Sequence, residues 1–398
     1  MFRRLPAAVV ALCCLAASLS GGSVSNAEQA SPDILPLTTA SGSAQTLDPG
    51  LYAGEVQTGA TRYAKVTRSP TETITVSLIT GPTVADKASD ISVELQLPDG
   101  TSCDKDTTST LRIDGASTMR SALVAIEQTP TRRGTSYLPK GCNTSTDLLL
   151  AVQISQGPRV EGHLVVLTEP RTTGSQGSAA AGQAQTPPLA PSMETTGEPV
   201  GGTGSYATAT TLVSGSYPLT LQPRRLETFR VRVGWGQQVG VSLEAPRNGT
   251  DVAPSVTMNV GLTLWSPQLV PINANTVGNK RDTTRLTAKN ATPEVIATGS
   301  ATVAWNNRNE TRAATDSGLS TGALAWASVA GWYYVTVWST ALPGPPSTGT
   351  PTTPPSAARS IPTRLNVVVK GTAAAGPNYV DAGGSAISSP EPTALSTG

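Results

Sequence analysis

The sequence predicts an all-β protein made of two antiparallel β-sandwiches in tandem, joined by a flexible linker. Threonine, serine, glycine, valine, alanine and proline dominate the chain, and periodic runs of good helix formers are missing. Short runs of alternating apolar and polar residues recur, each bounded by glycine, proline, asparagine or aspartate, as in sandwich proteins. One block of sequence also occurs twice, which indicates two copies of one folding unit.

The first 27 residues have the pattern of a cleaved Sec-type signal peptide. Arg3 and Arg4 precede the apolar run Leu5 to Leu19, and small residues then lead to a cleavage site after Ala27. No later run approaches the roughly 18 consecutive apolar residues of a transmembrane helix. We therefore expect a protein that is secreted, extracellular or associated with the cell wall, without a membrane-spanning segment.

The exported chain is close to neutral. Of 28 basic residues, Arg3 and Arg4 leave with the signal peptide, so that 26 basic residues face 27 acidic ones. No basic stripe or block is present, which argues against a nucleic-acid partner and against binding to an anionic membrane. The sequence gives no indication of a cofactor.

Two cysteines remain after removal of the signal peptide. Cys13 and Cys14 lie in the apolar run of the signal, so Cys103 and Cys142 form the only mature pair. Outside the cytoplasm such a pair is expected to form a disulfide, with Cα atoms roughly 4.4–6.8 Å apart. A zinc site is disfavoured because the chain has one histidine.

The internal repeat sets the expected domain boundaries. Ala44–Leu78 aligns without a gap with Ala209–Leu243 at an offset of 165 residues, and ten of these 35 positions are identical. Later runs match with insertions: Ser92–Gly100 with Asn259–Pro267, Asp147–Ser155 with Trp332–Thr340, and Gly162–Pro170 with Arg364–Thr372. We expect sandwiches over 43–170 and 203–372, a Gly/Ser/Ala/Pro linker over 171–202, and disordered segments over 28–42 and 373–398.

The pattern of turn and apolar residues in each copy resembles the bacterial pre-peptidase C-terminal domain. The resemblance is carried by Leu47, Gly50, Tyr52 and Val66 in the first copy and by Leu212, Gly215, Tyr217, Val231, Gly331, Tyr333, Val335 and Val337 in the second. The stretch Gly234–Gln238 also resembles tandem modules of exported actinobacterial proteins associated with von Willebrand factor A domains. The resemblance implies a jelly-roll-like sandwich that accompanies a secreted enzyme or binds a substrate. This chain departs from the family in having no catalytic domain attached.

Residues typical of catalysis or metal binding are few. His163 lies in an expected strand, and the Gly-x-Ser-x-Gly match at Gly318–Gly322 has neither a downstream histidine nor a following helix pattern. Asp99, Asp104 and Asp106 cluster beside Cys103, where they could hold a calcium ion or could simply form turns. We expect no catalytic residues and no metal, and a secreted hydrolase is the weakest alternative.

The stretch GWYYVTVWST, Gly331 to Thr340, is expected to be a strand with large side chains on both faces. Tyr333, Val335 and Val337 alternate on one face, and Trp332, Tyr334 and Trp338 on the other. The second face is either a platform for a polysaccharide or an envelope protein, or a surface covered by the proline-rich loop after Ala341 or by the tail. The sequence thus favours an exported non-catalytic accessory or interaction protein, with a carbohydrate-binding module as the alternative.

Overall fold

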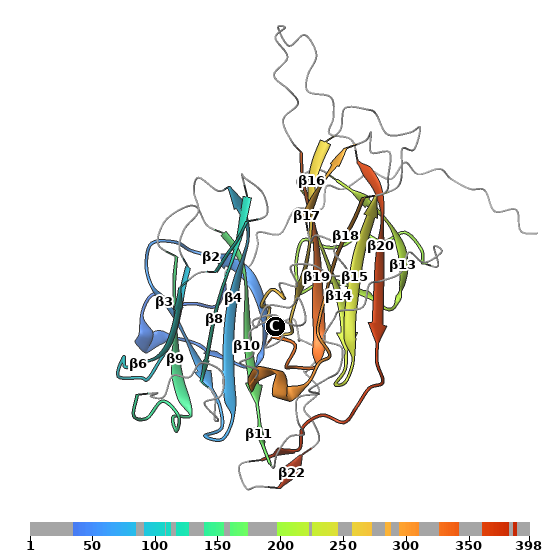
Figure 1. The fold of residues 1–398 in the computed structure, drawn as a ribbon. Helices are drawn as coiled ribbons and strands as arrows, with labels where there is room; N and C mark the ends of the chain where they lie inside the picture. The colour runs from blue at the N-terminus through green and yellow to red at the C-terminus, as the bar shows by residue number, and fades with distance from the viewer. Residues whose placement is uncertain are drawn as a thin grey trace, which may run out of the picture. The chain divides into compact units, whose positions relative to one another are not determined.

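The strands form two sandwiches of two sheets each, which confirms the predicted all-β fold (Figure 1). The structure is a computed structural model, and it describes residues 35–84, 91–107, 109–112, 117–126, 139–154, 160–173, 197–222, 225–245, 257–272, 283–287, 294–309, 326–341, 360–381 and 385–387. The expected signal peptide, the Gly318–Gly322 motif, the proline-rich loop after Ala341 and most of the linker lie outside these residues. Within them, no helix is long and apolar enough to cross a membrane.

The first sandwich contains two five-stranded sheets. In sheet order, the first consists of β1 (Thr46–Leu47), β3 (Arg62–Thr67), β9 (Asp147–Ile154), β5 (Ile91–Gln96) and β6 (Ser102–Thr107). The second consists of β2 (Gly50–Val56), β10 (Val160–Glu169), β4 (Thr73–Val84), β8 (Ser117–Ile126) and β7 (Ser109–Arg112). A short 3₁₀ helix, η1 (Ser41–Ser43), precedes them.

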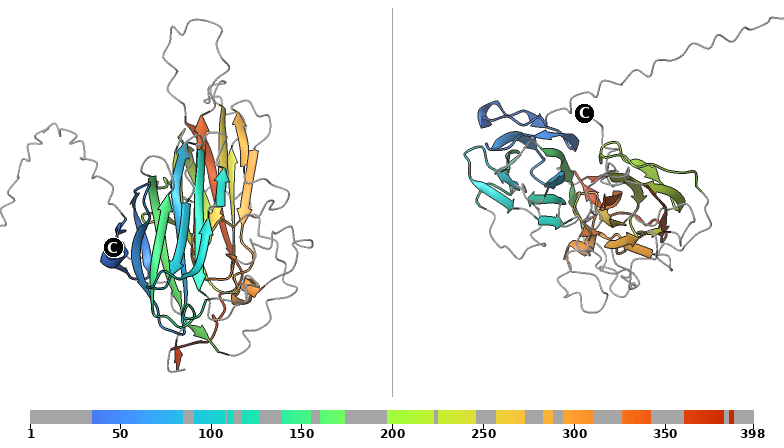
Figure 2. Two further views of the ribbon diagram at one scale, coloured as in Figure 1. Left: turned by 90° about the vertical axis from the view of Figure 1, so that its left-hand side faces the viewer. Right: turned by 90° about the horizontal axis from the view of Figure 1, so that it is seen from above.

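The second sandwich contains a five-stranded and a four-stranded sheet, and Figure 2 shows the two layers from above. The five-stranded sheet consists of β12 (Thr210–Leu212), β14 (Leu226–Val233), β19 (Gly331–Ala341), β16 (Thr257–Trp265) and β17 (Thr283–Thr287). The other consists of β13 (Gly215–Leu221), β20 (Ile361–Lys370), β15 (Gln238–Ala245) and β18 (Glu294–Gly299), and the 3₁₀ helix η3 (Trp305–Asn309) follows β18.

The strand order of the second sandwich repeats that of the first. In both, the first strand is short and runs parallel to its neighbour in the sheet. Leu47 of β1 pairs with Val66 of β3, and Leu212 of β12 pairs with Val231 of β14. Both of these pairs are related by the offset of 165 residues found in the sequence. The same connectivity therefore accompanies the repeated block, as expected for a duplicated unit.

Two of the later sequence matches are out of register. Leu164 pairs with Tyr52 and Leu78, and Leu365 makes the equivalent pairs with Tyr217 and Leu243, so β20 matches β10 one residue away from the predicted alignment. Both strands contain consecutive valines, so the sequences align equally well in two registers. The error matters because a shift of one residue assigns each side chain to the opposite face of the strand. The match of β5 with β16 is displaced by two residues, which preserves the face.

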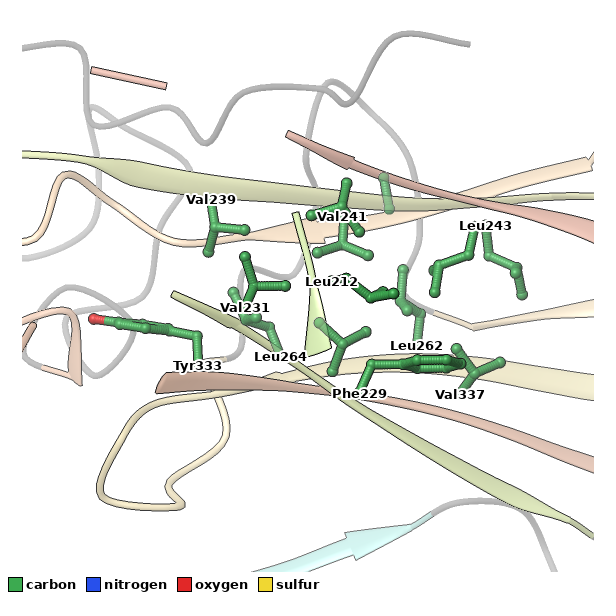
Figure 3. Packing of buried hydrophobic residues seen from close by; sticks show 14 of the residues in the cluster. Leu212, Phe229, Val231, Val239, Val241, Leu243, Leu262, Leu264, Tyr333 and Val337 are labelled. Carbon is green, nitrogen blue, oxygen red and sulfur yellow. The ribbon is translucent and has the colours of Figure 1, made fainter. Parts of the chain in front are cut away.

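Each sandwich has its own apolar core between its sheets. In the second, Phe229, Tyr333 and Val337 point from one sheet toward Val241 and Leu243 of the other (Figure 3). This arrangement confirms the predicted phase of β19, because Tyr333, Val335 and Val337 are all buried in this core. The alternation of side chains along an extended chain is sufficient to produce it.

The boundaries differ from those expected in three segments: the entry segment 28–42, the linker 171–202, where Val200 also packs on the second core, and the tail 373–398. Leu35 and Leu37, expected in a disordered segment, are buried in the core of the first sandwich because both are apolar and Leu35 donates a backbone hydrogen bond to Glu55. In the expected disordered tail, β21 (Tyr379–Val380) pairs with both β11 (Arg171–Thr172) and β22 (Ala386–Ile387). Asp33–Gly398, which includes both sandwiches, forms one compact unit.

The predicted disulfide joins Cys103 of β6 to Cys142, with Cα atoms 5.6 Å apart. Arg68, which is buried, holds the turn at Cys142 by donating from Nη2 to the Cys142 carbonyl at 2.7 Å. The bridge thus connects an edge strand to the turn before β9, inside the first core.

Removing this disulfide should destabilise the first sandwich. The cysteines are 39 residues apart, and closing a loop of that length contributes about 4 kcal/mol in the chain-entropy model. The double replacement Cys103→Ser/Cys142→Ser should lower the melting temperature of the first sandwich, measured by calorimetry. Reduction of the unmodified protein with dithiothreitol should lower it in the same way. An unchanged melting profile in both experiments would contradict this prediction.

Candidate functional site

The outer face of β19 carries the three aromatic residues predicted as a platform. Trp332, Tyr334 and Trp338 point away from the core that holds Tyr333 and Val335, as predicted. Tyr334 is 1% exposed and Trp338 is 5% exposed, whereas Trp332 is half-buried. Two of the three side chains are therefore not available to a ligand in this structure.

The first sandwich covers this face. Leu51 of β2, Ile79 of β4 and Val165 of β10 belong to the same buried cluster as Tyr334 and Trp338. These three strands lie in the second sheet of the first sandwich, and their side chains point away from its core. The sequence left open a ligand or partner, the proline-rich loop after Ala341, or the tail as the cover of this face. Within the described residues, the first sandwich covers Tyr334 and Trp338.

Tyr206, just before β12, lies at the centre of this cluster and was not identified from the sequence. Its ring makes edge-on contacts with Trp265 at 5.8 Å and Tyr334 at 5.5 Å between centroids. Such pairs contribute about 0.5–1.5 kcal/mol each beyond the burial of area. Burial raises the pKa of Tyr206 well above its ordinary value and that of Tyr334 to about 12, so both hydroxyls stay neutral.

The tight turn after β16 also enters the contact. Leu269 is fully buried in the aromatic cluster at a φ of 51°, a conformation that costs a non-glycine residue roughly 1–2 kcal/mol. Ser77 Oγ of β4 donates to the carbonyl oxygen of Gln268 at 2.6 Å. Apolar packing of Leu269 and this cross-sandwich hydrogen bond hold the turn in place.

Glu169, at the end of β10, connects three parts of the chain. Arg308 of η3 donates to both carboxylate oxygens, at 2.7 and 3.0 Å, and the hydroxyl of Tyr379 donates to Oε1 at 2.9 Å. Trp305 Nε1 donates to the same oxygen at 3.2 Å, and its ring lies 4.5 Å from the Arg308 guanidinium. The first sandwich, the second sandwich and the C-terminal strand β21 thus meet at one carboxylate.

Replacing Glu169 with alanine should loosen this junction. The substitution leaves the guanidinium of Arg308, whose side chain is 10% exposed, without its carboxylate partner. Removing one partner of a fully buried ion pair lowers the free energy of unfolding by about 3–5 kcal/mol. The 18% exposure of Glu169 lowers our expectation to about 2–3 kcal/mol. Thermal unfolding should show this loss, and Glu169→Gln, which keeps one carbonyl oxygen as an acceptor, should lose less. Equal melting temperatures for wild type and Glu169→Ala would show that the junction adds no stability.

His163 of β10 lies at the edge of the aromatic cluster. It is 2% exposed, with Nε2 3.0 Å from Ser205 Oγ and the ring 5.0 Å from that of Tyr206. A serine next to a histidine is the arrangement of a hydrolase nucleophile, but among the described residues no hydrogen-bond partner of the buried Nδ1 orients the ring. Ser205 Oγ also accepts the backbone N–H of Ala207, which fits a local structural role.

Two of the three aspartates beside Cys103, Asp99 and Asp104, have structural partners, and the side chain of Asp106 lies outside the described residues. Asp99 Oδ1 accepts the backbone N–H of Thr101 at 2.9 Å, and Asp104 Oδ2 accepts that of Ala125 at 2.8 Å, which links β6 to β8. Hydrogen bonding by Thr101 lowers the pKa of Asp99. Among the described residues, no group of three or more histidine, cysteine or acidic side chains is arranged to hold a metal ion.

Trp332 marks the rim of the covered face. Arg230 and Arg232 of β14 lie over its ring, at 4.7 and 5.7 Å from the centroid. Arg230 Nε also donates to Thr211 Oγ1 at 2.9 Å. The rim therefore combines one partly exposed indole with two guanidinium groups.

No protein-family model and no curated protein matches the chain. Among solved structures, the CUB1-EGF-CUB2 domain of human MASP-1/3 is 7% identical, with a TM-score of 0.15, over 79% of this chain and 99% of that one. The ANXUR2 extracellular domain from Arabidopsis thaliana is 10% identical, with a TM-score of 0.18, over 86% of each chain. At such TM-scores the similarity carries no argument about function.

Proposed function

We propose that the protein is an exported, non-catalytic accessory or interaction protein of the bacterial cell envelope or the medium. The observation that carries the proposal is the buried contact between the two sandwiches, centred on Tyr206, Tyr334 and Trp338. A fixed contact of this kind lets loops of both sandwiches present one preorganised surface, which reduces the entropy lost on binding. The pre-peptidase C-terminal resemblance supports an accessory role for each sandwich.

Export is supported by two independent features. The disulfide between Cys103 and Cys142 is typical of proteins in oxidising compartments, and the first 27 residues have the pattern of a signal peptide. Expression with the natural N-terminus, followed by cell fractionation and intact-mass measurement, tests this part. A chain that starts near Glu28 in the envelope or the medium supports it, and full-length protein retained in the cytosol contradicts it.

The interaction role is tested by capture. The purified protein is incubated with the envelope of the source cells and treated with a small amount of chemical cross-linker. We expect one defined cross-linked complex. Screening the same protein for hydrolysis of ester, peptide and glycoside substrates should show no turnover above that of a Ser205→Ala variant. Turnover that the variant loses would favour the hydrolase instead.

A carbohydrate-binding role is the second candidate, favoured by the partial exposure of Trp332 beside Arg230. An indole ring can stack on the apolar face of a sugar while a guanidinium binds its oxygens. Pull-down with insoluble polysaccharides should then lose signal in Trp332→Ala with little change in melting temperature. Equal retention of Trp332→Ala and wild type would exclude this rim as the binding site.

A further inference from the structure

The buried imidazole of His163 spans the contact between the sandwiches. It belongs to β10 of the first sandwich, whereas Ser205 and Tyr206, which contact its ring, belong to the segment that leads into the second. Each of these contacts exists only while the two sandwiches are packed together. The ionisation of this ring is therefore coupled to the contact itself.

The surroundings of His163 accept a neutral ring better than a charged one. Nε2 has the Ser205 hydroxyl as its partner, and Nδ1 is buried without any partner among the described residues. A protonated ring would carry an N–H on both nitrogens, which would leave one buried donor unpaired beside a buried charge. Opening the contact to water would remove both penalties.

The neighbouring groups offer little compensation for a positive charge. Glu161, on the same strand, has Oε1 3.9 Å from Nε2, but its side chain is 54% exposed and burial raises its pKa. The residues paired with His163 on β2 and β4 are Ala53 and Ile79, which carry no charge. From the facing segment, Tyr206 contributes a hydroxyl that stays neutral.

We propose that the contact between the two sandwiches opens in acid, driven by protonation of His163. Opening uncovers the aromatic cluster of Tyr206, Trp265, Tyr334 and Trp338, which the closed form buries. Glu169 and the pairing of β11 with β21 also join the two halves, so the movement is a hinge at that junction and not a complete separation.

The direction and the pH range follow from linkage. Burial lowers the pKa of His163 to about 4 in the closed form, and the open form restores a value near the ordinary 6.5. Between these values the open form binds more protons, so closure is fully favoured above pH 6.5 and weakens as the pH falls toward 4. The ratio of closed to open molecules should fall by up to about tenfold per pH unit, a few hundredfold in total.

Scattering and spectroscopy on the exported chain test the proposal between pH 7.5 and 4.5. His163 is the only histidine of the sequence, so its imidazole can be followed alone by NMR. We expect the radius of gyration and acrylamide quenching of tryptophan to rise with its protonation, while the far-UV spectrum of the strands persists. His163→Gln, which can still pair with Ser205, should stay closed throughout, and His163→Phe provides a second non-titrating variant.

The outcomes separate this mechanism from others. Opening of His163→Gln over the same range would assign the change to carboxylates and overturn the proposal, as would wild type that stays closed at pH 4.5. Loss of the far-UV spectrum together with the rise in radius would indicate global unfolding and also overturn it. Glu161→Gln should still open, but at lower pH, because it removes the nearest anion to the imidazolium.

Discussion

Replacing Val335 with aspartate should unfold the second sandwich. Val335 is fully buried in the centre of β19, between Phe229 of β14 and Leu264 of β16. An unpaired carboxylate at this position costs several kcal/mol, comparable with the 5–15 kcal/mol that stabilises a typical domain. Circular dichroism and calorimetry should show the loss of one of the two sandwiches or of the whole unit.

The control for this experiment is the same change at a solvent-exposed valine of the same sandwich. Val213 is 68% exposed, so Val213→Asp should change the melting temperature little. A stable Val335→Asp variant would mean that the faces of β19 are exchanged, with Val335 facing water.

Replacing Trp338 with alanine should have the second-largest effect. Its indole lies against Gly261 of β16, where a Cβ atom would overlap the ring, and it is 5% exposed. Truncating an aromatic residue packed this closely costs about 3–5 kcal/mol, which should lower the melting temperature by several degrees.

The half-buried Trp332 provides the matched comparison. Trp332→Ala should cost clearly less, because its ring keeps solvent on one side and contacts Arg230 and Arg232 instead of a core. If Trp338→Ala kept its melting temperature but lost binding to a polysaccharide, the face would be an open platform in solution. That result would contradict the packing described above.

The sequence was sufficient to predict features that depend on local patterns. The phase of Tyr333, Val335 and Val337 follows from alternation along one strand, and the pairing of Cys103 with Cys142 follows from their being the only cysteines outside the expected signal peptide. Duplication was visible because the turn residues and the strands keep constant spacing over the first four strands of each copy.

The partner of the aromatic face was not predictable in the same way. Tyr206 lies between a linker and a repeat, where no periodicity marks it as buried, and Leu51 and Val165 read as ordinary strand residues. Arg308 and Tyr379 reach Glu169 from 139 and 210 residues away along the chain, and single charged residues so far apart form no pattern in the sequence. Such contacts depend on how two finished sandwiches fit together. The six tryptophans of the second copy were the one available signal.

The contact joins unlike sheets of the two repeats, and this has a consequence for assembly. A contact between unlike faces can propagate into a filament if every unit carries both faces. The equivalent positions on the other two sheets are mostly polar. Ser216, Ser242 and Asn366, all buried, occupy the places of Leu51, Ser77 and Val165, and Asp147, Leu149 and Gln153 occupy those of Trp332, Tyr334 and Trp338. Neither of these sheets therefore repeats the apolar and aromatic pattern of the contact, which disfavours addition of a further unit in the same way, as polar terminal repeats do in solenoid proteins.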